Sequence, residues 1–365
     1  MASLANYRYP WEKFRRVNRR HPCPICGHDS YCGYNSHMAS CMREPNGAFK
    51  LVEMKDGGIA YLHWLVEPAR RANAVNEDAS RIIKMVPPAP VEVRDRVYRD
   101  FLNMLTLDKR HRDDLLRRGL SIDSIKKTGY RSMPGLRDSF QSRSICKRLI
   151  GMGHDLSGIP GFYVKKGKYG EYWTFQGGPG YFIPVVDHEG RIQALQRRMD
   201  GSVSGKYRLF SCSEKNGCTS GTPAHVAVPE EIRDGRIWIT EGPLKANIAS
   251  ELLGAVFVGA ISANTWRPAL EMLDKLMGRE KKEVVIAYDM DYLKNDFVRY
   301  HLKKLAEELE KREVETFWAC WDKDVKGIDD ALQKGLKIRI LRRRDRNDRT
   351  GEERLPEKSR AAGAN

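Results

Sequence analysis

The sequence predicts an α/β protein whose main element is a mostly parallel sheet of four or more strands with helices. Before that sheet we expect a small β subdomain, a helical segment and a cysteine-rich N-terminal unit. The sheet is predicted because short apolar runs alternate with stretches of helical periodicity from residue 236 on, which is the rhythm of βαβ units. The N-terminal unit is predicted by four cysteines within residues 23–41.

Changes in composition and periodicity along the 365 residues predict six segments. The stretch that ends in VPPAP has no lasting period and is typical of a linker. The final stretch has almost no apolar residues, so we expect it to be disordered. The segments are the cysteine-rich unit 1–65, the linker 66–90, the helical segment 91–150, the β subdomain 151–235, the sheet domain 236–341 and the tail 342–365.

Local patterns define the elements inside these segments. A hairpin is expected over 51–65, turned at residues 56–58, and another over 180–199, turned at 187–190, with a third strand over 205–211. Apolar positions at helical spacing predict short basic helices in 91–150. In the sheet domain we expect strands at 236–240, 255–260, 283–288, 314–320 and 336–341, and helices at 243–253, 265–277, 293–312 and 328–335.

Composition limits the classes of function. Lysine and arginine outnumber aspartate and glutamate by 64 to 48, a net charge of +16 that suits a polyanionic partner such as nucleic acid. No apolar run is long enough to span a membrane and no secretory signal is visible, so we expect a cytoplasmic protein without a membrane partner. The chain has no GxxxxGK[ST] motif, so any helicase must act in trans.

The cysteine cluster predicts a structural zinc site. Cys23 and Cys26 form a CxxC knuckle followed by glycine, and Cys32 and Cys41 supply a second pair of thiolates, which completes a tetrahedral set. His28 or His37 could replace Cys32. Cations interleaved with aromatic residues precede the knuckle, and they suit a single strand of nucleic acid or, alternatively, a solvated face with a small hydrophobic anchor. They are Arg15, Arg16, Arg19 and Arg20 beside Tyr7, Tyr9, Trp11 and Phe14.

Carboxylates follow several of the predicted strands. Glu241 ends one strand and is followed by a glycine that permits a tight turn and a proline that suits the start of a helix. Asp289 and Asp291 stand two apart after another strand, so both are expected to point the same way. Asp329 and Asp330 come after the next strand, although Asp329 could equally be a helix N-cap. Together they predict an oxygen-ligand site for Mg²⁺ or Mn²⁺.

This arrangement of EG, DxD and a later acidic pair resembles the Toprim domain of bacterial primases, topoisomerases and some nucleases. The segment GYFIPVVDHEGRIQALQRRM followed by GKYRLFS resembles the part that precedes Toprim in the bacterial DnaG-type primase core, and such primases also carry an N-terminal zinc ribbon. The whole order resembles primase-like Toprim proteins of phages and mobile elements, including a family known only as a domain of unknown function.

The resemblance implies roles for individual residues. Glu241 would work in acid/base catalysis, and Asp289 and Asp291, helped by Asp329 or Asp330, would hold the divalent metals. Arg197, Arg198 and Lys206 would contact template or incoming triphosphate, or alternatively form a solvated basic strand. Apart from the resemblance, Lys245, Arg19 and Arg20 are further candidates for contact with nucleic acid or nucleotide. The family usually has a carboxylate where this chain has Lys245, and its acidic pair is separated rather than adjacent.

The first hypothesis is therefore a DNA primase that joins ribonucleotides on a single-stranded DNA template by metal-dependent nucleotidyl transfer. Its partners would be single-stranded DNA, nucleoside triphosphates and a replicative helicase. The alternatives are a Toprim nuclease, which would activate water with the same carboxylates, and a non-catalytic DNA-binding accessory protein. The DnaG-like hairpin favours polymerisation, whereas Lys245 keeps the non-catalytic hypothesis open.

Overall fold

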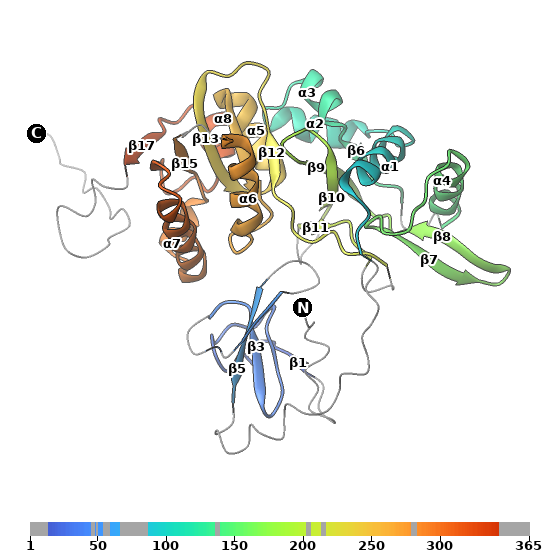
Figure 1. The fold of residues 1–365 in the computed structure, drawn as a ribbon, viewed down its shortest axis with the longest axis horizontal. Helices are drawn as coiled ribbons and strands as arrows, with labels where there is room; N and C mark the ends of the chain where they lie inside the picture. The colour runs from blue at the N-terminus through green and yellow to red at the C-terminus, as the bar shows by residue number, and fades with distance from the viewer. Residues whose placement is uncertain are drawn as a thin grey trace, which may run out of the picture. The chain divides into compact units, whose positions relative to one another are not determined.

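The computed structural model describes residues 14–44, 48, 50–53, 59–65, 87–135, 139–201, 206–212, 217–278 and 283–342. Most of the expected linker and all but the first residue of the expected tail lie outside the described residues. The chain divides into two compact units, Met1–Ala224 and His225–Asn365. Figure 1 shows the elements of both units.

The N-terminal part of the first unit is an antiparallel sheet with strand order β1-β2-β3-β5-β4. The hairpin expected over 51–65 is present as β4 and β5, which pair Lys50 with Leu62 and Val52 with Ala60; its expected turn lies outside the described residues. All four residues of β3 are buried, as befits a central strand. The strands are β1 Arg15–Arg16, β2 Gly33–Tyr34, β3 Met38–Cys41, β4 Lys50–Glu53 and β5 Ile59–Trp64.

Four helices follow, as the periodicity of residues 91–150 predicts. Helix α1 buries Val97, Tyr98, Phe101 and Leu102, whose spacing puts them on one face. Helix α3 is capped by the Ser121 hydroxyl, which accepts a hydrogen bond from the Ser124 N–H at 3.1 Å. The helices are α1 Val91–Asn103, α2 Lys109–Arg117, α3 Ile122–Thr128 and α4 Ser139–Gly151.

The second sheet of this unit has strand order β11-β10-β9-β6. It contains the hairpin expected over 180–199, now seen as β9 paired antiparallel with β10. The Asp187 carboxylate closes the turn by accepting hydrogen bonds from the N–H groups of Glu189 and Arg191, both at 2.9 Å. The strands are β6 Arg131–Ser132, β9 Gly180–Val186, β10 Ile192–Met199 and β11 Tyr207–Leu209.

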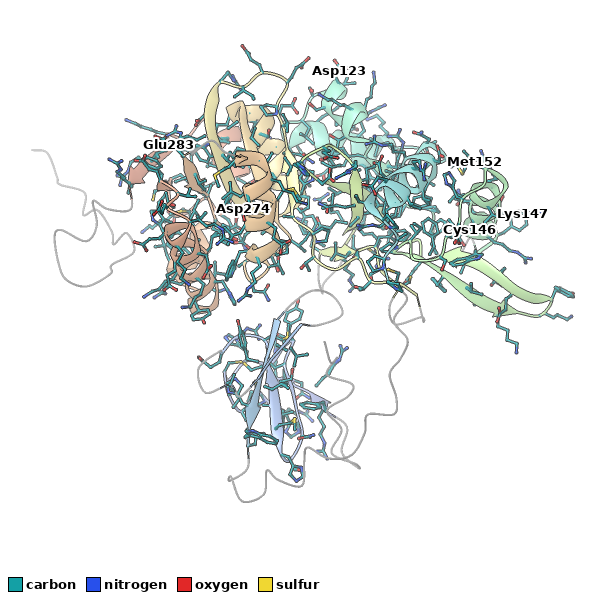
Figure 2. The ribbon with its side chains drawn as sticks, in the orientation of Figure 1. Asp123, Cys146, Lys147, Met152, Asp274 and Glu283 are labelled. Atoms are coloured by element: carbon teal, nitrogen blue, oxygen red, sulfur yellow. The ribbon has the colours of Figure 1, made fainter. Side chains whose placement is uncertain are left out.

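A separate two-stranded hairpin, β7 Phe162–Gly167 and β8 Gly170–Phe175, was not foreseen from the sequence. Helix α4 contacts β8, and Figure 2 labels Cys146, which is buried, and Lys147, which is exposed, on that helix. One hydrophobic core joins α1 and α4 to the β7–β8 hairpin and to the β11-β10-β9-β6 sheet, with aromatic rings in edge and stacked contacts at its centre. The rings belong to Phe101, Phe162, Phe175, Phe182 and Phe210.

The second unit contains a six-stranded sheet of order β12-β14-β13-β15-β16-β17. The predicted α/β class is confirmed, because the four inner strands run parallel and helices connect them. The last strand, β17, runs antiparallel to β16 at one edge, which the βα rhythm did not predict. The strands are β12 His225–Ala227, β13 Asp234–Glu241, β14 Ala255–Ala260, β15 Val284–Ile286, β16 Thr316–Cys320 and β17 Arg339–Arg342.

The helices of this sheet divide into two pairs. Helix α5 contacts α8, and α6 contacts α7. Because crossover connections are right-handed, the chain changes sheet face where it reverses direction after β14, which puts α5 on one face and α6 and α7 on the other. The helices are α5 Pro243–Leu253, α6 Trp266–Met277, α7 Asp296–Lys311 and α8 Ile328–Gln333.

This reversal creates a topological switch point between β13 and β15. The two strands are parallel neighbours, yet the helices that follow them lie on opposite faces. In open α/β sheets such a point leaves a crevice at the carboxyl ends of the strands, where ligands bind. The residues that follow β13 and β15 are therefore the first place to look for chemistry.

Candidate active site and zinc site

Strand β13 delivers Glu241 to the carboxyl edge of the sheet. Gly242 then turns the chain with a φ of +86°, a left-handed conformation that suits glycine, and Pro243 opens α5. The Gly242 N–H donates to the Ala260 carbonyl of the neighbouring strand at 2.6 Å, which fixes the turn against β14. Glu241 is thus held by a rigid strand and a constrained turn rather than by a loose loop.

Asp289 comes from the segment after β15 and is buried, with 8% of its surface exposed. The Ala287 N–H donates to the Ile239 carbonyl of β13 at 2.8 Å, and the Thr240 hydroxyl donates to the Ala287 carbonyl at 2.8 Å. These bonds continue the pairing of the two strands beyond the end of β15. As a result the backbone next to Asp289 is tied to the backbone next to Glu241.

The prediction that strand alternation points Asp289 and Asp291 the same way is wrong. Strand β15 ends at Ile286, and residues Met290–Leu293 form a 3-10 helix instead of an extended strand. The two-residue period that would point Asp289 and Asp291 the same way therefore does not apply. The backbone turns early because the Met290 N–H donates to the Lys326 carbonyl at 2.9 Å. The side chain of Asp291 lies outside the described residues.

The acidic pair lies in the first turn of α8, where the structure separates its two members. Asp329 is buried and Asp330 is exposed. The N-cap of this helix is Gly327, so the N-cap alternative for Asp329 is wrong. The Oδ1 atom of Asp329 is buried without a hydrogen-bond partner, and burial raises the pKa of this carboxyl, with Lys245 acting in the opposite direction.

Lys245, from the first turn of α5, lies among these carboxylates. Its ammonium makes an ion pair and hydrogen bond with Asp289 Oδ1. Burial would lower the pKa of Lys245, but the nearby charges of Asp289, Glu241 and Asp329 outweigh burial and raise it above the usual value. A second lysine, Lys326, lies 3.7 Å from Asp289 Oδ2 but is largely exposed. Lys326 belongs to no motif in the sequence that would have pointed to it.

Gly327 is needed where α8 approaches α5. A Cβ atom at this position would clash with Asp329 Oδ1 and lie 3.4 Å from Lys245 Nζ. The side chains of Asp329 and Lys245 therefore both lie close to Gly327. The sequence offered a weak signal for this contact in the glycine that precedes the acidic pair.

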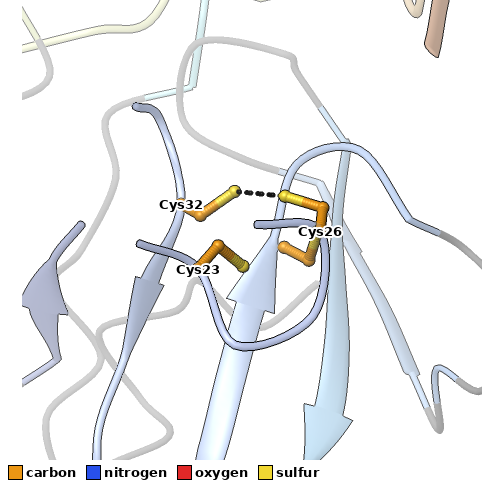
Figure 3. A group of neighbouring side chains, drawn as sticks. Cys23, Cys26 and Cys32 are labelled. Carbon is orange, nitrogen blue, oxygen red and sulfur yellow. Dashed lines mark hydrogen bonds between the residues drawn. The ribbon is translucent and has the colours of Figure 1, made fainter. Parts of the chain in front are cut away.

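The four cysteines expected to bind zinc come together in the N-terminal sheet. The Sγ atoms of Cys23, Cys26, Cys32 and Cys41 all lie within 4.8 Å of one another. Figure 3 shows Cys26 and Cys32, whose sulfur atoms are 3.8 Å apart, with Cys23 beside them. Four thiolates are one of the ligand sets that bind structural zinc tetrahedrally, and the described geometry fits it.

Backbone N–H groups also point at these sulfur atoms, as expected where thiolates carry negative charge. Met42 donates to Cys32 Sγ at 3.4 Å, and Glu44 donates to Cys41 Sγ at 3.2 Å. The alternative histidines are not in the group: among the described residues the cluster contains cysteines only, and His37 Nδ1 instead forms a 2.6 Å hydrogen bond with the Ser36 hydroxyl. In the described part of the chain this is the one group of three or more Cys, His, Asp or Glu side chains found in an arrangement that could hold a metal ion.

The basic residues expected to contact nucleic acid lie in different environments. Arg198 is engaged inside the protein, where it pairs with Asp114 and donates to the Tyr181 hydroxyl at 3.2 Å. Arg197 is buried against the Phe210 ring and donates to the Leu209 carbonyl at 3.4 Å.

The remaining basic candidates lie at the surface. Lys206 is exposed, and its carbonyl accepts a hydrogen bond from the Met199 N–H. Arg19 and Arg20 are exposed, with Arg19 lying 3.7 Å from Asp29. Tyr7, Tyr9 and Trp11 lie outside the described residues.

The structure also contains a polar network that the sequence did not reveal. His111 is buried, and its ring contacts the Ser132 hydroxyl at 2.6 Å and Asp200 Oδ2 at 3.0 Å. The Asp108 N–H donates to the same hydroxyl at 2.8 Å. Ser132 is itself buried, so this network joins α2, β6 and the end of β10 rather than presenting a nucleophile.

Comparison with known proteins gives one family match. The profile of a family described as "Domain of unknown function (DUF3854)" matches residues 232–337, which include Glu241, Lys245, Asp289 and Asp329. A search of the curated proteins found no match.

Several solved structures are similar to this chain. They include the zinc-binding and RNA polymerase domains of the Aquifex aeolicus primase, with 16% identity, a TM-score of 0.49 and coverage of 68% of this chain and 61% of that one. The RNA polymerase domain of Mycobacterium tuberculosis primase DnaG has 15% identity, a TM-score of 0.49 and coverage of 72% and 88%. A DnaG primase catalytic domain bound to single-stranded DNA has 15% identity, a TM-score of 0.43 and coverage of 67% and 78%.

No described helix has both the length and the apolar character that crossing a membrane requires.

Proposed function

We propose that this chain is a primase-like nucleotidyltransferase that joins ribonucleotides on a single-stranded DNA template. One observation carries the proposal: carboxylates from the strand-to-helix junctions after three neighbouring strands, β13, β15 and β16, all act on the Lys245 ammonium at the switch point of a parallel sheet. They are Glu241, Asp289 and Asp329. Such a site has the hard oxygen donors and the location that phosphoryl transfer uses.

The donor set suits a divalent ion because Asp329 Oδ1 is buried without a partner. Mg²⁺ or Mn²⁺, when bound, would neutralise phosphate charge and polarise the reacting oxygens. In this assignment Asp289 and Asp329 bind the ion, with Asp291 and Asp330 as further candidates. Glu241 accepts or returns a proton next to the reacting atoms.

The elements outside this site favour polymerisation over cleavage. The β9–β10 hairpin and the following Lys206-Tyr207 pair resemble the primase core that precedes a Toprim domain. The cysteine site would stabilise a ribbon that presents Arg19 and Arg20 to a template. Lys206 remains a candidate for contact with template or nucleotide, and the partners would be nucleoside triphosphates and a helicase supplied in trans. Arg198, paired with Asp114, is better assigned to the core.

The test is primer synthesis by the full chain on single-stranded DNA with labelled ribonucleotides and Mg²⁺ or Mn²⁺. We expect the wild type to make short oligoribonucleotides and Asp289→Asn to lose at least about 100-fold in rate, a typical cost when a buried electrostatic group of an active site is removed. The matched control is Asp123→Asn, which changes an exposed aspartate on α3 and should leave the rate unchanged.

Two other outcomes would assign a different function. Shortening of the DNA that depends on Asp289 would indicate the metal-dependent nuclease. DNA binding without synthesis or cleavage, also after a helicase is added, would indicate the non-catalytic accessory protein. The position of Lys245 among the carboxylates is the specific observation that favours this last alternative.

A further inference from the structure

The charged group at the centre of the candidate active site is an ammonium that belongs to the chain itself. Lys245 Nζ contacts Asp289 Oδ1, and the charges of Glu241 and Asp329 also act on it. The Lys245 side chain is only 16% exposed and that of Asp289 only 11%. The pair is therefore a buried feature of the site and not a surface ion pair that solvent screens.

The position of this lysine opposes the electrostatics of its own helix. Lys245 is the third residue of α5, where the positive end of the helix dipole favours an acidic side chain and disfavours a cation. Lysine and glutamate have similar helix propensities, so propensity gives no reason for a cation rather than an acid here. The stabilising interaction is with the carboxylates, so the residue is best explained by the charge balance of the site.

An ammonium in this position limits what else can bind. Two-metal sites hold their ions about 3.5–4 Å apart between shared carboxylates. The Lys245 ammonium is already bound to Asp289 Oδ1 and would repel a divalent ion on that oxygen, so Asp289 can bind a metal ion only through its other oxygen, Oδ2. Asp329 Oδ1, in contrast, has no hydrogen-bond partner and is available as a ligand.

We propose that the Lys245 ammonium takes the place of one divalent ion, so that this site binds a single Mg²⁺ or Mn²⁺ ion, with Asp329 as a ligand. The inference rests on the proposed metal-dependent function and makes it more specific. Lys245 is then a fixed positive charge that positions Asp289 and offsets phosphate charge, which a second metal does in two-metal enzymes.

The test counts bound Mn²⁺ by electron paramagnetic resonance on the full chain with its zinc in place, without DNA or nucleotide. We expect one Mn²⁺ per wild-type chain and none in Asp329→Asn. Lys245→Asp adds a carboxylate and removes the ammonium, so it should bind two ions. Lys245→Met should bind the single ion roughly tenfold tighter, because a like charge is removed from its neighbourhood.

The matched control is Lys326→Met, which removes the other lysine near Asp289. The Lys326 side chain is 64% exposed and its Nζ lies 3.7 Å from the other Asp289 oxygen, Oδ2, so solvent screens it and the number of ions should stay at one. Circular dichroism shows whether Lys245→Asp folds. If it does not fold, the test depends on the Mn²⁺ affinity of Lys245→Met.

Three results would overturn the inference: two ions in the wild type, no ion in the wild type, or equal Mn²⁺ affinity in the wild type and Lys245→Met. Ion counting needs no primer synthesis, so the two proposals fail separately. Synthesis by a chain that binds two ions keeps the proposed function and removes this inference. One ion bound by a chain that makes no primer keeps this inference and removes the proposed function.

Discussion

At the scale of single residues, burial determines the role of each charged side chain. Arg198 and Asp114 are each only 13% exposed and pair with one another, whereas Arg117, which also contacts Asp114, is 76% exposed. Arg198 resembled a nucleic-acid contact in the sequence because a strand of basic residues gives no sign of which side chains turn inward. Its partner lies 84 residues away, so no local pattern could have revealed the pair.

The Asp114 pair gives a stability prediction. Asp114→Ala leaves the Arg198 guanidinium buried without its carboxylate, and we expect a loss of about 3–5 kcal/mol in the free energy of unfolding. Arg117→Ala, the matched control, removes an exposed partner and should cost less than about 1 kcal/mol. Denaturant unfolding measures both changes. Equal losses in the two variants would show that the buried pair adds nothing beyond a surface contact.

A second prediction at this scale concerns pH. Burial lowers the pKa of His225 to about 4, although its hydrogen bond with Asn247 acts in the opposite direction. The folded pKa lies below the unfolded value of 6.5, so the unfolded chain takes up the proton first and stability falls as the pH drops from 6.5 towards 4. We expect a loss of roughly 2–3 kcal/mol from this residue between pH 7.5 and 4.5.

The measurement compares unfolding of the wild type and His225→Gln at both pH values. Glutamine can keep a hydrogen bond to Asn247 but cannot titrate. Between pH 7.5 and 4.5 the variant should therefore lose roughly 2–3 kcal/mol less stability than the wild type. His301, whose pKa burial also lowers to about 4, stays in both proteins and contributes equally. An acid sensitivity that is unchanged by the substitution contradicts the assignment to His225.

At the scale of elements, the sequence predicted the parts that depend on local periodicity. The alternation of strands and helices from β13 to α8 follows from short apolar runs and helical spacing, and the β9–β10 hairpin follows from two apolar runs around a turn signal. The antiparallel direction of β17 and the β7–β8 hairpin did not follow, because strand direction depends on tertiary pairing and β7 alternates poorly between buried and exposed residues. The candidate site could be proposed from the sequence as carboxylates at strand ends, whereas the 3-10 turn at Asp291 and the Lys245 ion pair required the three-dimensional contacts.

The N-terminal sheet gives a prediction about metal removal. Its strands are short, and a thin core holds the four cysteines, so the folding of this element should depend on zinc, which contributes on the order of 10 kcal/mol. We expect one zinc per chain in the wild type and none in Cys26→Ser. Cys146→Ser, which changes a buried cysteine of α4, should keep its zinc. Atomic absorption measures the metal, and retained zinc in Cys26→Ser would contradict the four-cysteine site.

At the scale of the whole molecule, the net charge of +16 predicts salt-dependent binding to single-stranded DNA. Each phosphate neutralised on a single strand contributes about −0.7 to the slope of log K against log salt. If Arg19 and Arg20 both contact phosphates, Arg19→Ala combined with Arg20→Ala should make the slope shallower by about 1.4. The matched control is Lys126→Ala with Lys127→Ala, two adjacent exposed cations on α3. Fluorescence anisotropy over a salt series measures this slope for each protein. An equal change of slope in both double variants would mean that the charge acts as a diffuse field. A change of slope confined to the arginine variant would locate the template on the zinc-site unit.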